Sequence, residues 1–266
     1  MLLSSAGWLH DALVLFAGLW AGTINAIVGS GTLVTFPVLV ALGYAPVAAT
    51  ISNAMGLVAG NIAGSWGYRR ELAGLGGTLL RLLPASILGG ITGAWLLLHL
   101  PEDVFGTVAP FLIVVALLFV VFQPKLQSWV RERAARTAEP GTVLQGPARP
   151  SWTLTVLIYL AGVYGGYFVA AQGILLVGIL GIFLHGTLQN ANAVKNILVL
   201  GVNLVAAASY MLFAFDRIVW PVVALIAVGS LIGGFIGAAV GRRLHPVVLR
   251  TVIVLLGLGA LWIMVF

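Results

Sequence analysis

The chain has 266 residues, of which 61% are hydrophobic and only 8% are charged, and its mean hydropathy is +1.12. A soluble protein of this length could not cover so much apolar surface with so few polar residues, so we expect an integral membrane protein surrounded by lipid. The absence of cysteine excludes disulfides, thiolate metal sites and cysteine nucleophiles. The net charge of +6 is spread through loops, which indicates membrane topology rather than a nucleic-acid partner.

Apolar segments long enough to form helices recur along the chain. The first half is predicted to contain segments 9–28, 32–42, 46–65, 77–98 and 103–122. A polar, basic linker at 123–151 follows, with one short amphipathic turn around Trp129. The second half is predicted to contain segments 153–172, 174–184, 188–213, 219–240 and 246–266. The predicted division is therefore a first transmembrane repeat at 1–122, the linker at 123–151 and a second transmembrane repeat at 152–266.

The two halves resemble each other in sequence. "AGLWAGTINAIVG" (17–29) aligns with "AGVYGGYFVAAQG" (161–173) at an offset of 144, and "LGGITGA" (88–94) aligns with "IGGFIGA" (232–238) at the same offset. Chance similarity between helices rich in glycine and alanine is the alternative, but the shared offset argues against it. Internal duplication of this kind is typical of transporters.

The distribution of charge indicates how the two halves are oriented. The positive-inside rule assigns the basic loop at 66–76, the linker and the loop around Arg242 to the cytoplasm. The acidic loops around Glu102 and Asp216 then lie outside, so equivalent loops of the two halves face opposite sides. We therefore expect an all-α integral membrane protein with two inverted repeats of four to five helical segments each. In this topology the protein is a multi-pass plasma-membrane protein with a cytoplasmic linker and both termini outside.

Each half contains one segment of only eleven residues, 32–42 or 174–184, and about 20 residues are needed to span a bilayer. These segments are either half-helices of a re-entrant hairpin or short tilted spans. Each follows a polar or glycine-rich break, at 29–31 and at 172–173. A broken helix in a membrane leaves backbone N–H groups at the positive end of a helix dipole, which suits an anion. Close packing also selects glycine, but equivalent breaks in both halves favour a binding site.

Lys195 is a charged residue well inside an apolar segment, and all seven acidic residues fall in loops or near segment ends. A cation inside a membrane is costly and lines a polar path or pairs with another group. An anionic substrate is therefore the predicted partner, and snorkelling of Lys195 to the interface is the alternative. Asparagines at helical spacing complete the predicted substrate-binding set, which is Asn25, Gly29, Ser30, Gly31, Asn53, Gln172, Gly173, Asn192, Lys195 and Asn196.

The sequence contains no intramembrane acid–base pair, no cluster of histidine and carboxylate and no phosphate-binding loop. We therefore expect neither an enzyme nor an ATP-driven pump, and no cofactor. A secondary transporter for a small anion fits best, and a passive channel for anions or small solutes is the alternative. A coupling proton or sodium ion and assembly into a homo-oligomer both stay open at this stage.

Two stretches carry a family likeness that covers nearly the whole chain outside the linker. "AGTINAIVGSGTLVTFPVLVALGYAPVAATISNAMG" resembles the first-half signature of the TauE/SafE sulfite-exporter family, in the toluenesulfonate-uptake permease superfamily, and "GVYGGYFVAAQGILLVGILG" with "NANAVKNIL" resembles the second-half signature. The chain departs from many relatives in having Gly-Ser-Gly-Thr where they have consecutive glycines, which bears on the substrate rather than on the fold. The resemblance implies transport of small sulfur-containing anions, such as sulfite or organosulfonates, across the plasma membrane.

Overall fold

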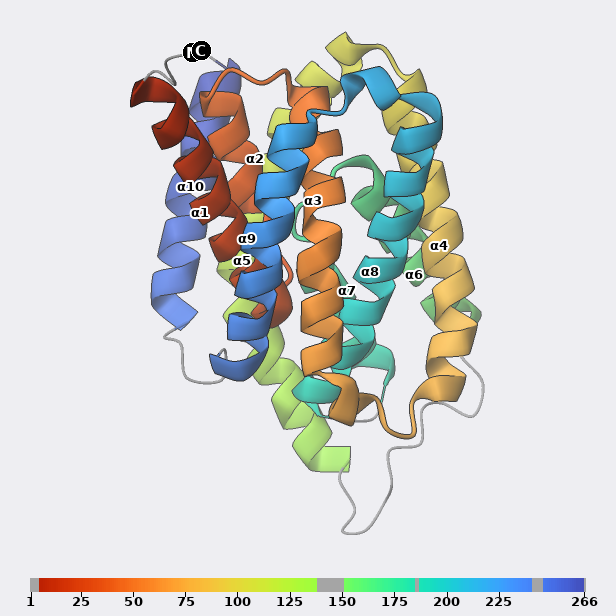
Figure 1. Ribbon diagram of the computed structural model, residues 1–266. Helices are drawn as coiled ribbons and strands as arrows, with labels where there is room; N and C mark the ends of the chain where they lie inside the picture. Colours follow the sequence, from red (N-terminus) through yellow and green to blue (C-terminus); the bar gives the residue numbers. More distant parts are fainter. Residues whose placement is uncertain (1–4, 138–150, 185–186, 241–245, 266) are drawn as a thin grey trace.

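The computed structural model describes residues 5–137, 151–184, 187–240 and 246–265, which form a bundle of helices (Figure 1). The first half contains α1 (Ser5–Ile27), α2 (Thr32–Ala41), α3 (Pro46–Gly67), the 3₁₀ turn η1 (Arg69–Leu72), α4 (Gly76–His99) and α5 (Glu102–Thr137). The second half contains α6 (Trp152–Tyr167), α7 (Gln172–Phe183), α8 (Leu188–Phe213), the 3₁₀ turn η2 (Phe215–Arg217), α9 (Trp220–Val240) and α10 (Pro246–Val265).

The described part of the chain is all-α, and six of its helices are long and apolar enough to cross a membrane. These six lie in α1, α3, α4, α5, α8 and α9. The predicted segments correspond one by one to the ten α-helices of the described residues. The chain is therefore a multi-pass membrane protein, as the composition predicts.

The linker is more helical than the sequence suggested. The predicted segment 103–122 ends too early, because α5 continues to Thr137 through two internal prolines, Pro110 and Pro124. Residues 123–137 include three Arg, two Gln and two Ala, which are strong helix formers. The polarity of this stretch therefore marks a change of surroundings rather than the end of the helix. The rest of the predicted linker, 138–150, lies outside the described residues.

The first helix break falls where it was predicted, between the end of α1 and the start of α2, and Gly29 there has a positive φ of 85°. The second break was placed too late. It comprises residues 168–171, and its left-handed positions are Val169 (φ 67°) and Ala171 (φ 58°). These residue types rarely adopt this conformation, so glycine content was a misleading guide. The predicted break at 172–173 is instead the first turn of α7.

The first short helix, α2, folds back along α1 to form a helical hairpin. A hydrogen bond of 3.2 Å joins the Tyr44 hydroxyl, just after α2, to Nε2 of His10 near the start of α1, so both ends of this hairpin lie together. In the second half α6 runs parallel to α4 and ends beside Gly93, short of the end of α4. Because α8 begins only five residues after α7 ends, α7 must return towards the start of α8.

Two contacts fix which loops share an end of the bundle. Nδ2 of Asn190, at the start of α8, donates to the Glu71 carbonyl in η1 at 2.9 Å. At the other end of α4, Arg217 in η2 forms an ion pair of 3.4 Å with Glu102. The loop that follows α3 and the loop that follows α8 therefore lie at opposite ends of the bundle (Figure 1).

Glycines bring α1 against α9 and α6 against α4 at backbone distance. A Cβ atom added to Gly22 would lie 2.2 Å from the Ser230 carbonyl oxygen, and one added to Gly233 would lie 2.0 Å from that of Leu19. The equivalent pair uses Gly89 and Gly93, whose added Cβ atoms would meet carbonyls of α6 at 2.2 and 2.1 Å. Small residues allow such close packing between membrane helices, where van der Waals contact replaces the hydrophobic effect.

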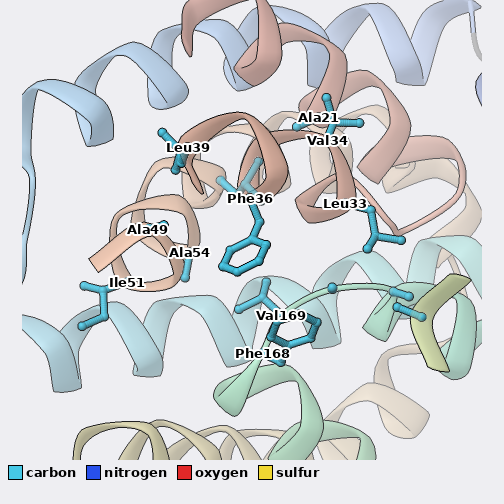
Figure 2. Close-up of a cluster of buried hydrophobic side chains, with 14 of the residues drawn as sticks. Ala21, Leu33, Val34, Phe36, Leu39, Ala49, Ile51, Ala54, Phe168 and Val169 are labelled. Carbon is cyan, nitrogen blue, oxygen red and sulfur yellow. The ribbon is translucent and has the colours of Figure 1, made fainter. Parts of the chain in front are cut away.

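Apolar side chains fill the space between the two hairpins. Figure 2 shows Phe36 of α2 facing Phe168 and Val169 of the second break. The rings of Phe36 and Phe168 meet edge to face with their centroids 5.6 Å apart, and Phe105 of α5 lies 6.1 Å from Phe168. These contacts hold the second break against α2.

The close packing of α1 and α9 predicts that Gly233→Ala destabilises the protein by at least about 2 kcal/mol, because backbone atoms cannot yield to the added methyl group. Gly106→Ala in α5 is the matched control, since an added Cβ there meets nothing within 4 Å. Thermal unfolding of the two variants in detergent measures the difference. Equal melting temperatures would contradict the packing described for these helices.

Candidate functional site

The first helix break meets the start of α7, just after the second break, inside the bundle. The N–H group of Gly173, in the first turn of α7, donates to the Gly29 carbonyl at 3.1 Å. A Cβ atom added to Gly29 would lie 2.5 Å from Cα of Gly173, and one added to Gly173 would lie 2.4 Å from Cα of Gly29. Only a pair of glycines allows this approach, because a Cβ atom at either position would clash with the backbone of the other.

Lys195 of α8 runs past this glycine pair and is 1% exposed. Its Cδ lies 3.2 and 3.0 Å from the positions that Cβ atoms on Gly29 and Gly173 would occupy. Its ammonium donates to the carbonyl oxygens of Asn25 at 3.0 Å and of Ala26 at 3.5 Å. These carbonyls belong to the last turn of α1, where helical carbonyls lack an intrahelical partner. Lys195 therefore joins the end of α1 to the meeting point of the two breaks.

The charge of Lys195 has no acidic partner in the described ranges, where the ion pairs include those of His10 with Asp11 and of Arg217 with Glu102. The negative end of the α1 dipole partly compensates it, because the two carbonyls lie at that helix terminus. An ammonium group has three donors, and the described residues supply acceptors for two of them. The third N–H bond of Lys195 has no acceptor among the described residues.

The start of α2 offers further donors beside Gly29. The backbone N–H groups of Ser30, Gly31 and Thr32 have no acceptor among the described residues, and the buried Ser30 hydroxyl also lacks a partner there. The first bonds of this helix begin with the Leu33 N–H group, which donates to the Ser30 carbonyl at 3.1 Å. This helix start thus has the unpaired donors and the dipole direction that attract an anion.

The predicted asparagines of the first half are occupied by protein contacts. Nδ2 of Asn25 donates to Oδ1 of Asn61 in α3. Asn53 accepts a hydrogen bond from Thr35 and donates to the Thr32 hydroxyl at 3.1 Å. These bonds hold the first hairpin on α3. Asn61, Thr32 and Thr35 were absent from the predicted set, although the spacing of eight residues between Asn53 and Asn61 put both asparagines on one helical face.

The amides of the second half are buried but less satisfied. Both amide atoms of Gln172 and Asn203, the Asn192 oxygen and the Asn196 nitrogen lack a partner in the part of the chain that the structure describes. Gln172 folds back on Gly165 in α6, where an added Cβ would lie 2.1 Å from its Cδ atom. Asn203 lies eight residues from Lys195 and thus on a similar face of α8. The predicted set did not include it.

The predicted set is brought together only in part. The carbonyl of Asn25, the glycine pair Gly29–Gly173 and the side chain of Lys195 are in contact, and Asn196 reaches the same end of α1, because its Nδ2 lies 3.8 Å from the Cβ position of Gly64 beside Ala26. Asn53 instead belongs to the contact between α2 and α3. No three His, Asp or Glu side chains of the described residues gather to hold a metal ion. The available groups are mostly donors, which suit an oxyanion.

Comparison with known proteins agrees with this membrane architecture. Residues 14–263 match the family described as "Sulfite exporter TauE/SafE". Among curated proteins, the "Probable membrane transporter protein YfcA" of Escherichia coli strain K12 is 26% identical over 241 residues, which cover 87% of this chain and 79% of that protein. A "Probable membrane transporter protein" of Haemophilus influenzae is 26% identical over 247 residues, which cover 92% and 90% of the two chains.

A third relative, the "Probable membrane transporter protein ORF9" of Sinorhizobium sp., is 28% identical over 238 residues, which cover 87% of this chain and 82% of that protein. No solved structure matches the chain. The family match extends from α1 to α10 and includes both helix breaks and Lys195. The chain therefore belongs to the sulfite exporter TauE/SafE family of membrane proteins, whose curated members found here are named as transporters.

Proposed function

We propose that the protein is a secondary transporter that carries a small sulfur-containing anion, of the sulfite or organosulfonate class, across the plasma membrane by alternating access. The observation that carries this proposal is the fully buried ammonium of Lys195 at the junction of two helix breaks, with one donor unfilled and no carboxylate partner among the described residues. The family match, which carries sulfite in its description, supports the class of substrate.

The chemistry of the junction supports an anion rather than a cation as the substrate. A buried cation costs several kcal/mol unless it is paired, and the dipole of α1 supplies only a partial negative charge. A bound oxyanion would accept from the third N–H bond of Lys195 and from the unpaired N–H groups at 30–32. The amides of Gln172, Asn192, Asn196 and Asn203 would then orient it from the second half.

Two inverted repeats would give the protein two halves that rock about this site. The pairing of α1 with α9 and of α6 with α4 supports the repeat, since each hairpin packs on the fourth α-helix of the other half. The loops after α3 and after α8 lie at opposite ends of the bundle, which supports the inversion of the repeat. With the basic loops in the cytoplasm, both termini lie outside.

A passive channel is the second candidate, but the burial of the site disfavours it. A channel needs a continuous polar lining, whereas Lys195 is 1% exposed and Phe36, Phe105 and Phe168 pack against one another beside the second break. Saturable, gradient-coupled flux in proteoliposomes indicates a transporter, and flux that rises linearly with concentration indicates a channel.

Lys195→Gln tests the anion site. We expect sulfite uptake to fall about thirtyfold or more, because the loss of one partner of a buried charge pair costs at least about 2 kcal/mol. Lys125→Gln is the matched control, since Lys125 is an exposed residue of α5. Uptake by reconstituted protein is measured after gel filtration has verified folding. Undiminished uptake by a folded Lys195→Gln variant would refute the assignment.

Cysteine labelling tests the inverted topology, and the natural chain contributes no cysteine background. Ala73→Cys and Asp216→Cys place single thiols in equivalent exposed loops after α3 and α8. We expect an impermeant maleimide added to whole cells to label Asp216→Cys and to label Ala73→Cys only after permeabilisation. Labelling of both from the same side would rule out inversion.

Gly165→Ala tests the contribution of Gln172 without altering the amide itself, because the added methyl group must displace that side chain. We expect the apparent affinity for sulfite to fall roughly tenfold, the value of one hydrogen bond to a charged group. Gly201→Ala is the control, since its added Cβ meets the apolar side chain of Leu83 at 2.9 Å. Equal affinities in the two variants would exclude Gln172 from the site.

A further inference from the structure

Two helices end inside the bundle, and each presents carbonyl oxygens there. The last turn of α1 contributes Asn25 and Ala26, and the last turn of α6 contributes Gly166. Such half-helix ends carry the negative end of the helix dipole, and in transporters with broken helices they coordinate the coupling sodium ion. What occupies these ends therefore bears on which ion, if any, drives transport.

Side chains of α8 occupy both ends. The Lys195 ammonium donates to the carbonyls of Asn25 and Ala26 at 3.0 and 3.5 Å. The Tyr210 hydroxyl donates to the Gly166 carbonyl at 3.1 Å. Gly89 meets the Tyr159 carbonyl as Gly233 meets that of Leu19, so α1 and α6 correspond at an offset of 140 rather than at the 144 of the sequence alignment. Ala26 and Gly166 are then equivalent positions of the two halves. One end therefore meets a cation and the other meets a neutral hydroxyl group.

The surroundings of Lys195 contain no competing charge in the described ranges. Its contacts include the end of α1, Gly29 in the first break and Gly173 in α7, and no ion pair of Lys195 is found among the described residues. Sodium sites are built from oxygen ligands, and here the two oxygens at the end of α1 already bind a cation that belongs to the chain.

We propose that the ammonium of Lys195 takes the place of a coupling sodium ion at the C-terminal end of α1, so that anion transport proceeds without sodium. The expected independence of anion flux from sodium rests on the proposed transport function. The expected binding of sodium at the vacated end of α1 does not. In this arrangement the single positive charge of Lys195 balances the charge of one monovalent anion.

A simple capping role is the competing explanation, because lysine side chains often bond to the last carbonyls of a helix. The two explanations differ once the ammonium is removed. If the end of α1 is a cation site, Lys195→Ala vacates it and leaves carbonyls that sodium can enter. Lys195→Met is the matched control, since its apolar side chain fills most of the same space without a charge.

The experiment measures thermal unfolding of the purified protein in sodium chloride and in choline chloride at equal ionic strength. We expect Lys195→Ala to be at least a few degrees more stable in sodium, and the wild type and Lys195→Met to show no difference between the salts. A Lys195→Ala variant that ignores sodium, or a wild type that is stabilised by it, would overturn the proposal.

Flux through the wild-type protein gives a second measurement that needs no folded variant. With sulfite as the probe anion, we expect uptake to change by less than about twofold when choline replaces sodium. Uptake that requires sodium would overturn the proposal while leaving the transport function intact. If sulfite and sulfonates are not carried at all, the proposed function fails, and the sodium response of Lys195→Ala still decides this inference.

Discussion

The structure depends on how backbone groups are satisfied where two helices stop inside a membrane. An unpaired N–H or carbonyl group in that setting costs several kcal/mol, so a break survives only if something replaces the helical bonds. Here the Gly173 N–H group bonds to the Gly29 carbonyl, and Lys195 bonds to the last carbonyls of α1. The same contact that satisfies the ends of the breaks also brings α1, α7 and α8 together at one point. The backbone N–H groups of residues 30–32 stay unpaired among the described residues.

The two halves differ in how their buried amides are satisfied. In the proposed repeat, α1 and α6 end 140 residues apart, so Asn25 corresponds to Gly165. In α3 and α8 the offset is 142, and it pairs Asn61 with Asn203 and Asn53 with Lys195. In the first half the amides bond to one another and to threonines. In the second half glycine at 165 leaves room for Gln172, whose amide has no partner among the described residues. The first half thus contributes unpaired donors at 30–32, and the second half carries most of the unpaired amides.

The sequence predicted the ten helical segments, because runs of apolar residues are a local signal for helices inside a membrane. It also identified Lys195 and the first break, since a charge and a glycine turn in an apolar segment are local signals. It misplaced the second break by several residues, because Val169 and Ala171 hold left-handed conformations through tertiary contacts such as that of Phe168 with Phe36. The contact of Gly29 with Gly173 and the bond from Lys195 to α1 join residues about 150 apart, and no local pattern reports such pairs.

The position of Lys195 also suggests how binding would reach the rest of the fold. An anion that draws the ammonium towards itself must compete with the carbonyls of Asn25 and Ala26, and so loosens the end of α1. Because Gly22 and Gly233 lock α1 against α9 at backbone distance, α1 cannot shift alone. Any displacement is shared with α9, a helix of the other half, and through the Ser230 hydroxyl, which accepts from the Gly60 N–H group at 3.1 Å, with α3. A change of partner at this ammonium would therefore be transmitted across both halves, as the proposed alternating access requires.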